Sequence, residues 1–352
     1  MPWHLPGNTI PVHDAGEFKK QGALTDMGKR ILITGVTGFV GSHMADLLLA
    51  EGGNEIFGLK RVNARMRNIH HIKSGLTLLD GDLIDETSLV RALEKSQPDR
   101  IYHFGALSWV TPSWDQPAAY MQTNAIGTIN LFEAMRITGN KARLLISCTP
   151  EEFGDVPQHM IPITEETRVH PINPYAASKA AQDMVCLSYE ASFGFEVVRT
   201  RAFNHEGARR DIHGANASFA YQIACIERGL QEPVIKVGNL EATRNFTDVR
   251  DTVRAYNLAM EKGIPGELYL IGTQEIHTMK ECLEMLISLS PKASEIRYEV
   301  DPARVRPTEL RTFIGKFDKF QNQTGWKPQI PFKETMNSLL EYWREFIDKG
   351  WY

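Results

Sequence analysis

The sequence predicts an α/β fold: a doubly wound parallel sheet (Rossmann) with a smaller C-terminal lobe. The apolar, β-branched-rich run at 31–33 suits a buried parallel strand, and it stops at a glycine-rich turn that opens an apolar-periodic segment at 42–50. The alternation of strand and helix continues through a helix expected at 124–136 and a strand expected at 143–147. Sheets of this kind bind their ligands at the carboxyl ends of the strands.

Composition limits the classes of function. The 352 residues are 42% hydrophobic and 23% charged, which is ordinary for one large α/β core with a smaller lobe. The formal net charge of -4 and the lack of a basic run argue against nucleic-acid and membrane-surface binding, and no apolar run approaches a membrane span. The four cysteines are far apart and form no CxxC pair. We therefore expect no metal site, no disulfide framework and a cytoplasmic location.

The glycine-rich turn predicts a dinucleotide site. Its glycines are spaced GxxGxxG, so the backbone can turn tightly and approach a ligand. The free N–H groups of the following helix would receive a pyrophosphate. A tight turn without a ligand is the alternative, but strand, turn and helix come in the order that dinucleotide binding requires. The predicted contacts here are Gly35, Gly38, Phe39, Val40 and Gly41.

We divide the chain into three parts. Residues 1–28 are expected to be an N-terminal extension, because they are polar and lack the basic-then-apolar pattern of a signal peptide. Residues 29–200 should form the dinucleotide-binding domain. Residues 201–352 should form mainly a substrate-binding lobe, with some segments returning to the core.

The end of the strand expected at 55–59 bears on the choice of cofactor. An acidic residue there usually holds a free ribose 2′-OH, whereas arginine meets a 2′-phosphate. This chain has Lys60 and Arg61 at that point. We predict NADP, with NAD still possible because basic residues in surface loops are often merely solvated.

The strands expected at 76–79 and 100–104 supply further candidate contacts. Asp82 could accept a hydrogen bond from an adenine amino group, or it could be a turn residue or the cap of a helix expected at 86–93. Small residues after the second of these strands would let the cofactor lie close to the backbone. The predicted contacts are Asp82, Leu83, Ala106 and Ser108.

Four polar side chains indicate the chemistry. Thr149 and Glu151 follow the strand expected at 143–147, so a hydroxyl and a carboxylate lie at its end. Tyr175 and Lys179 share one face of a helix. A lysine ammonium beside a tyrosine favours the phenolate, which could take a proton from a sugar hydroxyl while hydride leaves the same carbon. YxxxK alone is a common accidental spacing, but here it follows a nucleotide-binding turn.

Together these motifs resemble an extended short-chain dehydrogenase/reductase of the NAD-dependent epimerase/dehydratase family, from residue 29 almost to the C-terminus. The resemblance is greatest to the GDP-mannose 4,6-dehydratase group and to the neighbouring GDP-4-keto-6-deoxymannose reductases. It is carried by GVTGFVG at 35–41, GLKR at 58–61, Thr149 with Glu151, Tyr175 with Lys179, FNH at 203–205 with Arg209 and Arg210, VGNLEATRNFTDVRD at 237–251 and RPTE at 306–309.

The resemblance implies a role for each catalytic candidate. Thr149 would hydrogen-bond the sugar O4, Tyr175 would deprotonate it, and Lys179 would bind the nicotinamide ribose and lower the tyrosine pKa. Glu151 would remove the C5 proton, which becomes acidic once C4 is a ketone. Loss of water from C6 and return of the hydride would then give the 4-keto-6-deoxy sugar.

The resemblance also implies a GDP-sugar substrate and a homodimer or homotetramer. Its helices at 118–136 and 174–192 would lie on one face of the sheet and pair across a two-fold axis. Guanidinium groups suit a diphosphate, although any one arginine could be a solvated charge or a structural ion pair. His205 is expected to be a packed residue rather than a catalyst. The predicted substrate contacts are Asn204, Arg209, Arg210, Arg244, Arg306 and Glu309.

Several functions remain open. Pro150 stands where related dehydratases carry an aspartic acid or a serine, so Glu151 would have to serve as base and later as acid. The motifs at 39–42 and 239–251 look more like the reductase branch, whereas NH at 204–205 followed by RR at 209–210 looks more like the dehydratase branch. A 4-epimerase would need only the tyrosine and the lysine, and a catalytically silent nucleotide-binding protein would need none of the four polar side chains. We predict the dehydratase, because a simple ketone reduction has no evident use for the carboxylate at the strand end.

Overall fold

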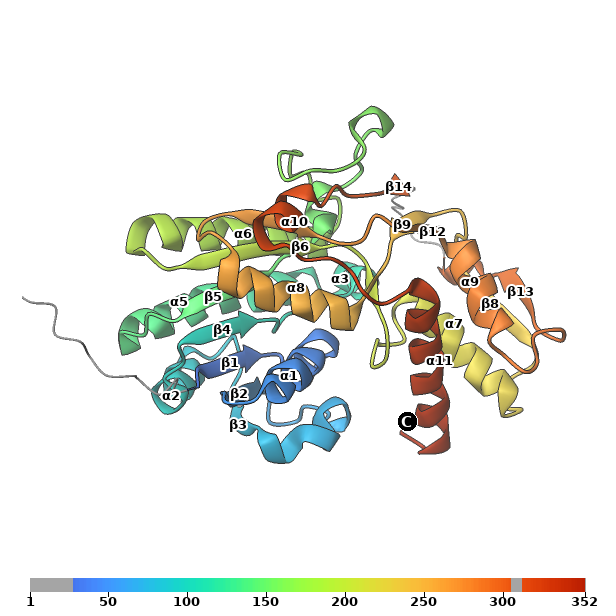
Figure 1. Ribbon diagram of the computed structural model, residues 1–352, viewed down its shortest axis with the longest axis horizontal. Helices are drawn as coiled ribbons and strands as arrows, with labels where there is room; N and C mark the ends of the chain where they lie inside the picture. Colours follow the sequence, from blue (N-terminus) through green and yellow to red (C-terminus); the bar gives the residue numbers. More distant parts are fainter. Residues whose placement is uncertain (1–27, 305–311, 352) are drawn as a thin grey trace, which may run out of the picture.

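The central sheet has seven parallel strands, in the order β11-β6-β5-β4-β1-β2-β3 (Figure 1). This computed structural model describes residues 28–304 and 312–351. The strands are β1 (Arg30–Thr34), β2 (Glu55–Lys60), β3 (Thr77–Asp80), β4 (Arg100–His103), β5 (Arg143–Ser147), β6 (Val197–Ala202) and β11 (Leu268–Ile271). The predicted doubly wound fold is confirmed, and the strand order reverses between β1 and β4, where ligands bind in such sheets.

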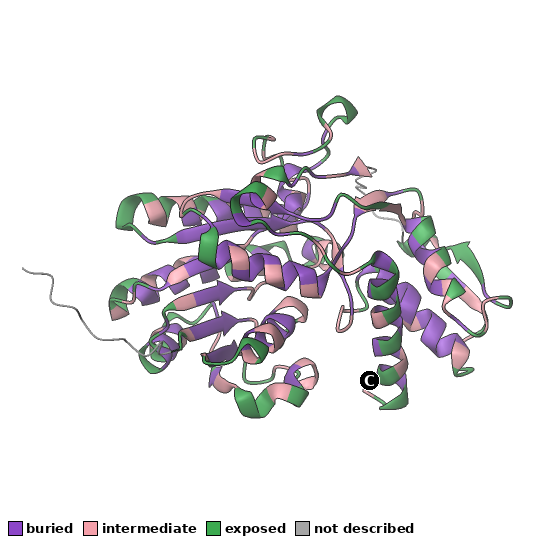
Figure 2. Cartoon of the chain, in the orientation of Figure 1, coloured by how far each residue is buried: buried purple, intermediate pink, exposed green. Residues whose placement is uncertain are grey.

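Helices cover both faces of the sheet. The first layer consists of α2 (Glu86–Ser96), α5 (Gly127–Thr138) and α6 (Pro174–Phe193), and the second of α1 (Phe39–Glu51) and α8 (Val249–Lys262). In β1, Leu32 packs with the first layer, whereas Ile31 and Ile33 pack with the second. The strands are therefore apolar on both faces and largely buried (Figure 2).

Local structure shifts some expected boundaries. The helix expected at 42–50 begins at Phe39, because Gly38 is its N-cap. The helix expected around 124–136 continues a longer helical stretch that starts at α4 (Pro117–Tyr120) and passes through the π-helical η2 (Met121–Ile126). A short helix, α3 (Val110–Asp115), precedes it. Short 3-10 helices are η1 (Arg67–Gly75), η3 (Pro150–Phe153), η4 (Gln158–Met160) and η5 (Pro302–Arg304).

The second lobe has its own core beside the carboxyl ends of the strands (Figure 1). Its helices are α7 (Ala215–Glu227), α9 (Met279–Ser288) and α11 (Phe332–Asp348). Its strand pairings are β8 (Val234–Val237) with β13 (Arg297–Val300), β9 (Thr243–Asn245) between β12 (Ile276–Thr278) and β14 (Thr312–Phe313), and β7 (His205–Glu206) with β10 (Thr247–Asp248). Between these segments the chain returns to the sheet as α8 and β11, and α10 (Asp318–Thr324) packs on both.

No helix within the described residues is long and apolar enough to span a bilayer. The same residues contain no group of three histidine, cysteine or acidic side chains that could hold a metal ion. All four cysteines are buried and free.

Candidate active site

A cleft of about 2060 Å³ lies between the carboxyl ends of the strands and the second lobe. All the predicted site residues that the structure describes line it: Gly35, Gly38, Phe39, Val40, Gly41, Lys60, Arg61, Asp82, Leu83, Ala106, Ser108, Thr149, Glu151, Tyr175, Lys179, Asn204, Arg209, Arg210 and Arg244. Arg306 and Glu309 lie outside the described residues. The folded chain thus brings the sequence motifs together in one cavity.

The glycine turn has the shape of a phosphate cradle. Gly35 has a φ of 71°, and a Cβ placed on it would lie 2.8 Å from the backbone nitrogen of Gly105. A Cβ on Gly41 would lie 2.3 Å from the carbonyl oxygen of Gly35, so α1 packs directly on the turn. The N-cap Gly38 makes no side-chain capping bond, and the first turn of α1 has no acidic residue. The N–H groups of that turn are therefore suited to a dinucleotide's phosphates.

Lys60 and Arg61 differ in their surroundings. Lys60 forms an ion pair with Asp80, at the end of β3. Arg61 is exposed on the cleft and forms no ion pair with any described residue. Arg61 is thus the better placed of the two to meet a 2′-phosphate.

Asp82 is a turn residue on the cleft wall. Its Oδ1 accepts a 3.3 Å hydrogen bond from the backbone N–H of Ile84, whereas the cap of α2 is Asp85. Of the two structural roles considered for Asp82, the turn residue is observed and the helix cap is wrong, because Asp85 directly precedes Glu86 and accepts the N–H of Ser88.

Asn124, on η2, fixes the backbone after β4. Its amide exchanges two hydrogen bonds with the backbone of Leu107, at 2.8 and 2.9 Å, and donates a third to the hydroxyl of Ser178 on α6. Ala106 and Ser108 are the cleft-lining neighbours of this anchored residue.

Two adjacent glutamates after β5 face different surroundings. Thr149 caps η3 through a capping box, in which Glu152 Oε1 accepts the Thr149 N–H at 2.9 Å. Glu152 is fully buried, whereas Glu151 lines the cleft. The carboxylate of Glu151 accepts a 3.3 Å hydrogen bond from the side chain of Asn173 and forms no ion pair with any described residue. It therefore lines the cleft without a cationic partner among the described residues.

Tyr175 lies in the first turn of α6, beside these residues. Burial raises its pKa, the charge of Glu151 raises it further, and the hydrogen bond with Thr149 lowers it. We expected Lys179 to lower this pKa. In the structure burial raises the pKa instead, and the Lys179 ammonium is directed at the Ser147 carbonyl, 2.5 Å away, and at Gln182.

The predicted arginines have distinct partners. Arg209 forms a 2.6 Å ion pair with Asp46 of α1, so a structural role accounts for much of its charge. Arg210 lies over the rings of Phe39 and Trp109, with its Cζ 5.2 and 4.9 Å from their centroids. These contacts join the glycine turn and the segment after β4 to the second lobe.

Arg244 and Asn204 lie deeper in the second lobe. The Arg244 guanidinium donates to the carbonyl oxygen of Thr243 and lies over the ring of Phe313. The backbone carbonyl of Asn204 accepts a 2.9 Å hydrogen bond from Thr247, which continues the pairing of β7 with β10.

Comparison with known proteins agrees with this geometry. A family model described as GDP-mannose 4,6 dehydratase matches residues 32–339. The chain belongs to the GDP-mannose 4,6-dehydratase family. It is 32% identical to the GDP-6-deoxy-D-mannose reductase of Pseudomonas aeruginosa, over 91% of this chain and 99% of that protein. It is 31% identical to a GDP-mannose 4,6-dehydratase of Yersinia enterocolitica, over 89% of this chain and 93% of that protein.

A solved structure gives the same picture. The structure of RMD from Pseudomonas aeruginosa, complexed with NADPH, matches 91% of this chain and 98% of its own with a TM-score of 0.78 and 30% identity. The chain therefore shares its fold with this solved structure, and it is an enzyme of the GDP-mannose 4,6-dehydratase family.

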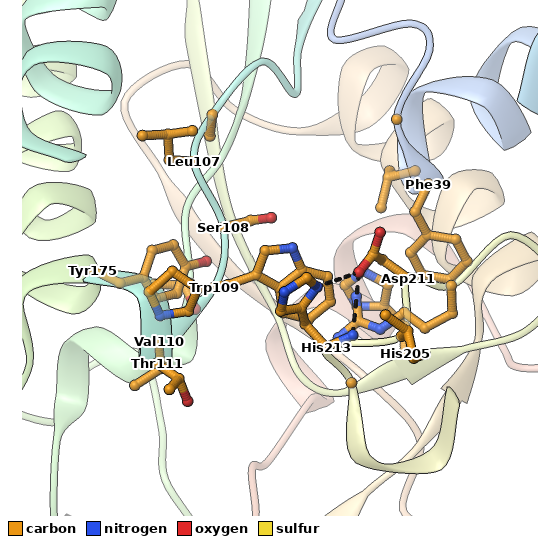
Figure 3. A pocket seen from close by; sticks show the side chains of 18 of the residues that line it. Phe39, Leu107, Ser108, Trp109, Val110, Thr111, Tyr175, His205, Asp211 and His213 are labelled. Carbon is orange, nitrogen blue, oxygen red and sulfur yellow. Dashed lines mark hydrogen bonds and ion pairs between the residues drawn. The ribbon is translucent and has the colours of Figure 1, made fainter. Parts of the chain in front are cut away.

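The mouth of the cleft in this family member contains residues that the sequence did not single out. Trp109 and His213 face one another with ring centroids 5.5 Å apart, and His213 Nδ1 lies 2.5 Å from a carboxylate oxygen of Asp211 (Figure 3). Two segments that are distant in the sequence thus meet over the cavity. A contact between segments so far apart cannot be predicted from a local sequence pattern.

His205 and Asn173 also acquire partners through the fold. His205 stacks on Phe39 with nearly parallel rings, and burial lowers its pKa to about 4, so it is neutral and packed at pH 7 as expected. Asn173 caps α6 by accepting from the N–H of Ala176. An asparagine before proline could have indicated that cap, but not its second bond to Glu151.

Proposed function

We propose that this protein is an NADP-dependent nucleotide-sugar 4,6-dehydratase, which converts GDP-mannose or a related GDP-sugar to its 4-keto-6-deoxy product. The observation that supports it most is that the two adjacent glutamates have different surroundings. Glu152 is buried and contacts Arg201 and the backbone N–H of Thr149. Glu151 is therefore the carboxylate that lines the cleft beside Thr149 and Tyr175. A general base at this point is what removal of a C5 proton requires.

Each residue would handle one proton or one contact. Thr149 holds the sugar O4 through its hydroxyl, and Tyr175 takes the O4 proton. NADP, if held in this cleft, would supply the hydride acceptor for oxidation at C4 and the hydride for C6. Glu151 removes the C5 proton and then gives it to the departing C6 hydroxyl, which leaves as water, because Pro150 has no proton to donate. When C6 accepts the hydride, C5 takes a proton from solvent, and Tyr175 releases the O4 proton to solvent. The glycine turn, Arg61 and Lys179 would hold the cofactor, since all of them line the cleft.

A reductase that acts on GDP-4-keto-6-deoxymannose is the second candidate. It is favoured by the 32% identity to the Pseudomonas aeruginosa reductase. In that reaction no C–H proton is removed, so Glu151 would have no catalytic task. The two candidates therefore differ in what a substitution of Glu151 does.

The deciding experiment is Glu151→Gln with GDP-mannose. The variant keeps the groups that oxidise C4 but lacks the base, so the reaction should stop with the nicotinamide reduced. Loss of a general base typically costs 10² to 10⁴ in rate. The measurements are absorbance of reduced nicotinamide, 6-deoxy product by mass spectrometry, and solvent deuterium at C5. Asp155→Asn, at an exposed position just after the same turn, is the matched control and should keep wild-type turnover.

The dehydratase proposal fails if wild-type protein leaves GDP-mannose unchanged yet oxidises NADPH with the 4-keto-6-deoxy sugar. In that case Glu151→Gln should change the reductase rate little.

We further propose that the protein acts in the cytoplasm as a homodimer or homotetramer. Four free, buried cysteines suit a reducing compartment. Exposed apolar side chains on the helices at η2 and α6 suit pairing with a second copy.

A further inference from the structure

Glu152 occupies the centre of a buried polar cluster beneath the active-site turn. Its side chain is fully buried, and its two oxygens have different partners. Oε1 accepts the backbone N–H of Thr149 at 2.9 Å, and Oε2 lies 2.8 Å from the guanidinium of Arg201 on β6. One carboxylate thus joins the turn that carries Thr149 to the sheet.

The cluster extends to the helix that carries the other two catalytic candidates. Arg201, whose side chain is 2% exposed, also pairs with Asp183 on α6 at 2.6 Å, and the second oxygen of Asp183 pairs with Arg199 at 2.7 Å. Asp183 follows Lys179 by four residues, so the two lie on the same side of α6. Carboxylates and guanidinium groups alternate from the active-site turn to α6.

Such a cluster is better suited to fixing geometry than to adding stability. Desolvation of buried ions offsets most of their attraction, but removal of one member leaves an uncompensated charge. Loss of Glu152 would leave Arg201 with one carboxylate and the Thr149 N–H without an acceptor. The turn could then shift relative to α6.

We propose that Glu152 is a positioning residue of the active site: through Arg201 and Asp183 it fixes Thr149 and Glu151 relative to Tyr175. The reaction affected is the one argued under Proposed function, on which this inference rests. Glu152 touches neither substrate nor cofactor and acts through the backbone of Thr149.

Charged and titratable groups surround Glu152 from three elements. They are Arg201 on β6, Asp183, Lys179 and Tyr175 on α6, and Cys148 after β5. Burial raises the pKa of Glu152 to about 7 against the opposing effect of Arg201. At pH values between the ordinary pKa of a glutamate and about 7, Glu152 is protonated in the folded protein but ionised in the unfolded chain. Glu152 therefore lowers stability as the pH rises through this window, and Glu152→Gln should lack that dependence.

The test compares Glu152→Gln and Glu152→Leu with wild-type protein. Glutamine can still accept the Thr149 N–H but offers no charge to Arg201, whereas leucine offers neither. A misplacement of about 1 Å can cost about 10²-fold in rate. We expect kcat to fall about 10-fold in the first variant and about 10²-fold in the second, with KM for the GDP-sugar within about twofold. The peptide 147–154 should exchange its amide hydrogens faster in both.

Glu227→Gln is the matched control. Glu227 on α7 is nearly buried and pairs with Arg344 on α11, inside the second lobe. This variant also breaks a buried ion pair and should lower stability. It should leave kcat and the exchange of peptide 147–154 unchanged.

Unchanged kcat and unchanged exchange of 147–154 in both Glu152 variants would overturn the proposal. Faster exchange throughout the protein, with kcat lost in proportion to the folded fraction, would also overturn it. The exchange measurement needs no substrate. It therefore decides the positioning role even if GDP-mannose and the keto sugar both prove to be wrong substrates.

Discussion

Arg61 is the residue on which the choice between NADP and NAD depends most. Arg61→Ala should weaken NADPH binding by about 1.5–3 kcal/mol, because a charge-assisted pair with the 2′-phosphate is lost. NADH binding should change little. Titration of both cofactors by fluorescence measures the difference. Lys60→Ala is the control and should cost less, since Lys60 already pairs with Asp80.

An NAD-dependent enzyme would give the opposite pattern. NADH would bind more tightly than NADPH to the wild-type protein, and Arg61→Ala would not weaken either cofactor.

Residue types could be predicted from the sequence better than their surroundings. The pattern indicated which side chains gather at the cleft, because strand ends and the helix spacing from Tyr175 to Lys179 fix their approximate places. It could not indicate that Glu152 turns inward, since two adjacent glutamates look alike. It also gave the wrong direction for the pKa of Tyr175, because the burial that raises this pKa depends on tertiary structure.

At the scale of elements, α1 depends on the absence of a side chain at Gly41. Helix propensity alone would favour Gly41→Ala by about 1 kcal/mol. The added Cβ would meet the carbonyl oxygen of Gly35, and overpacking of this kind costs about 1–3 kcal/mol. We therefore expect lower stability in urea denaturation, together with weaker NADPH binding as the turn shifts.

Ala50→Ser, at the exposed end of α1, is the control and should change stability by less than about 0.5 kcal/mol. A Gly41→Ala variant that is more stable than the wild type and binds NADPH equally well would contradict this prediction.

Apolar periodicity predicted the first five strands of the sheet, and the helices beside them, to within a few residues, because both faces of the sheet are covered. Apolar periodicity missed the first turn of α1. The N-cap is Gly38, and a glycine has no side chain that would mark a helix start in the sequence. It also missed η2, because the shift from α- to π-helical bonding leaves no mark in the periodicity.

At the scale of the whole molecule, the exposed apolar side chains of η2 and α6 predict self-association. Met121, Ile126 and Met184 are between 40% and 49% exposed. We expect sedimentation at micromolar concentration to show a dimer or a larger assembly. Ile126→Glu combined with Met184→Glu should yield monomers, because like charges would face one another across a two-fold axis.

Ile264→Glu is the matched control, since Ile264 is 51% exposed but follows α8 on the other side of the sheet. It should leave the assembly intact. A wild-type protein that sediments only as a monomer would contradict the prediction.

The path of the chain through the sheet has a consequence during synthesis. β6 pairs with β5 on one side and with β11 on the other, although the segment from β7 to α8 separates β6 from β11 in the sequence. Ribosomes add about 5–20 residues per second, so the outer edge of β6 stays open for several seconds. An open edge strand invites mispairing, which charged side chains discourage. Arg199 and Arg201, which end up paired with Asp183, would protect the nascent chain in that interval.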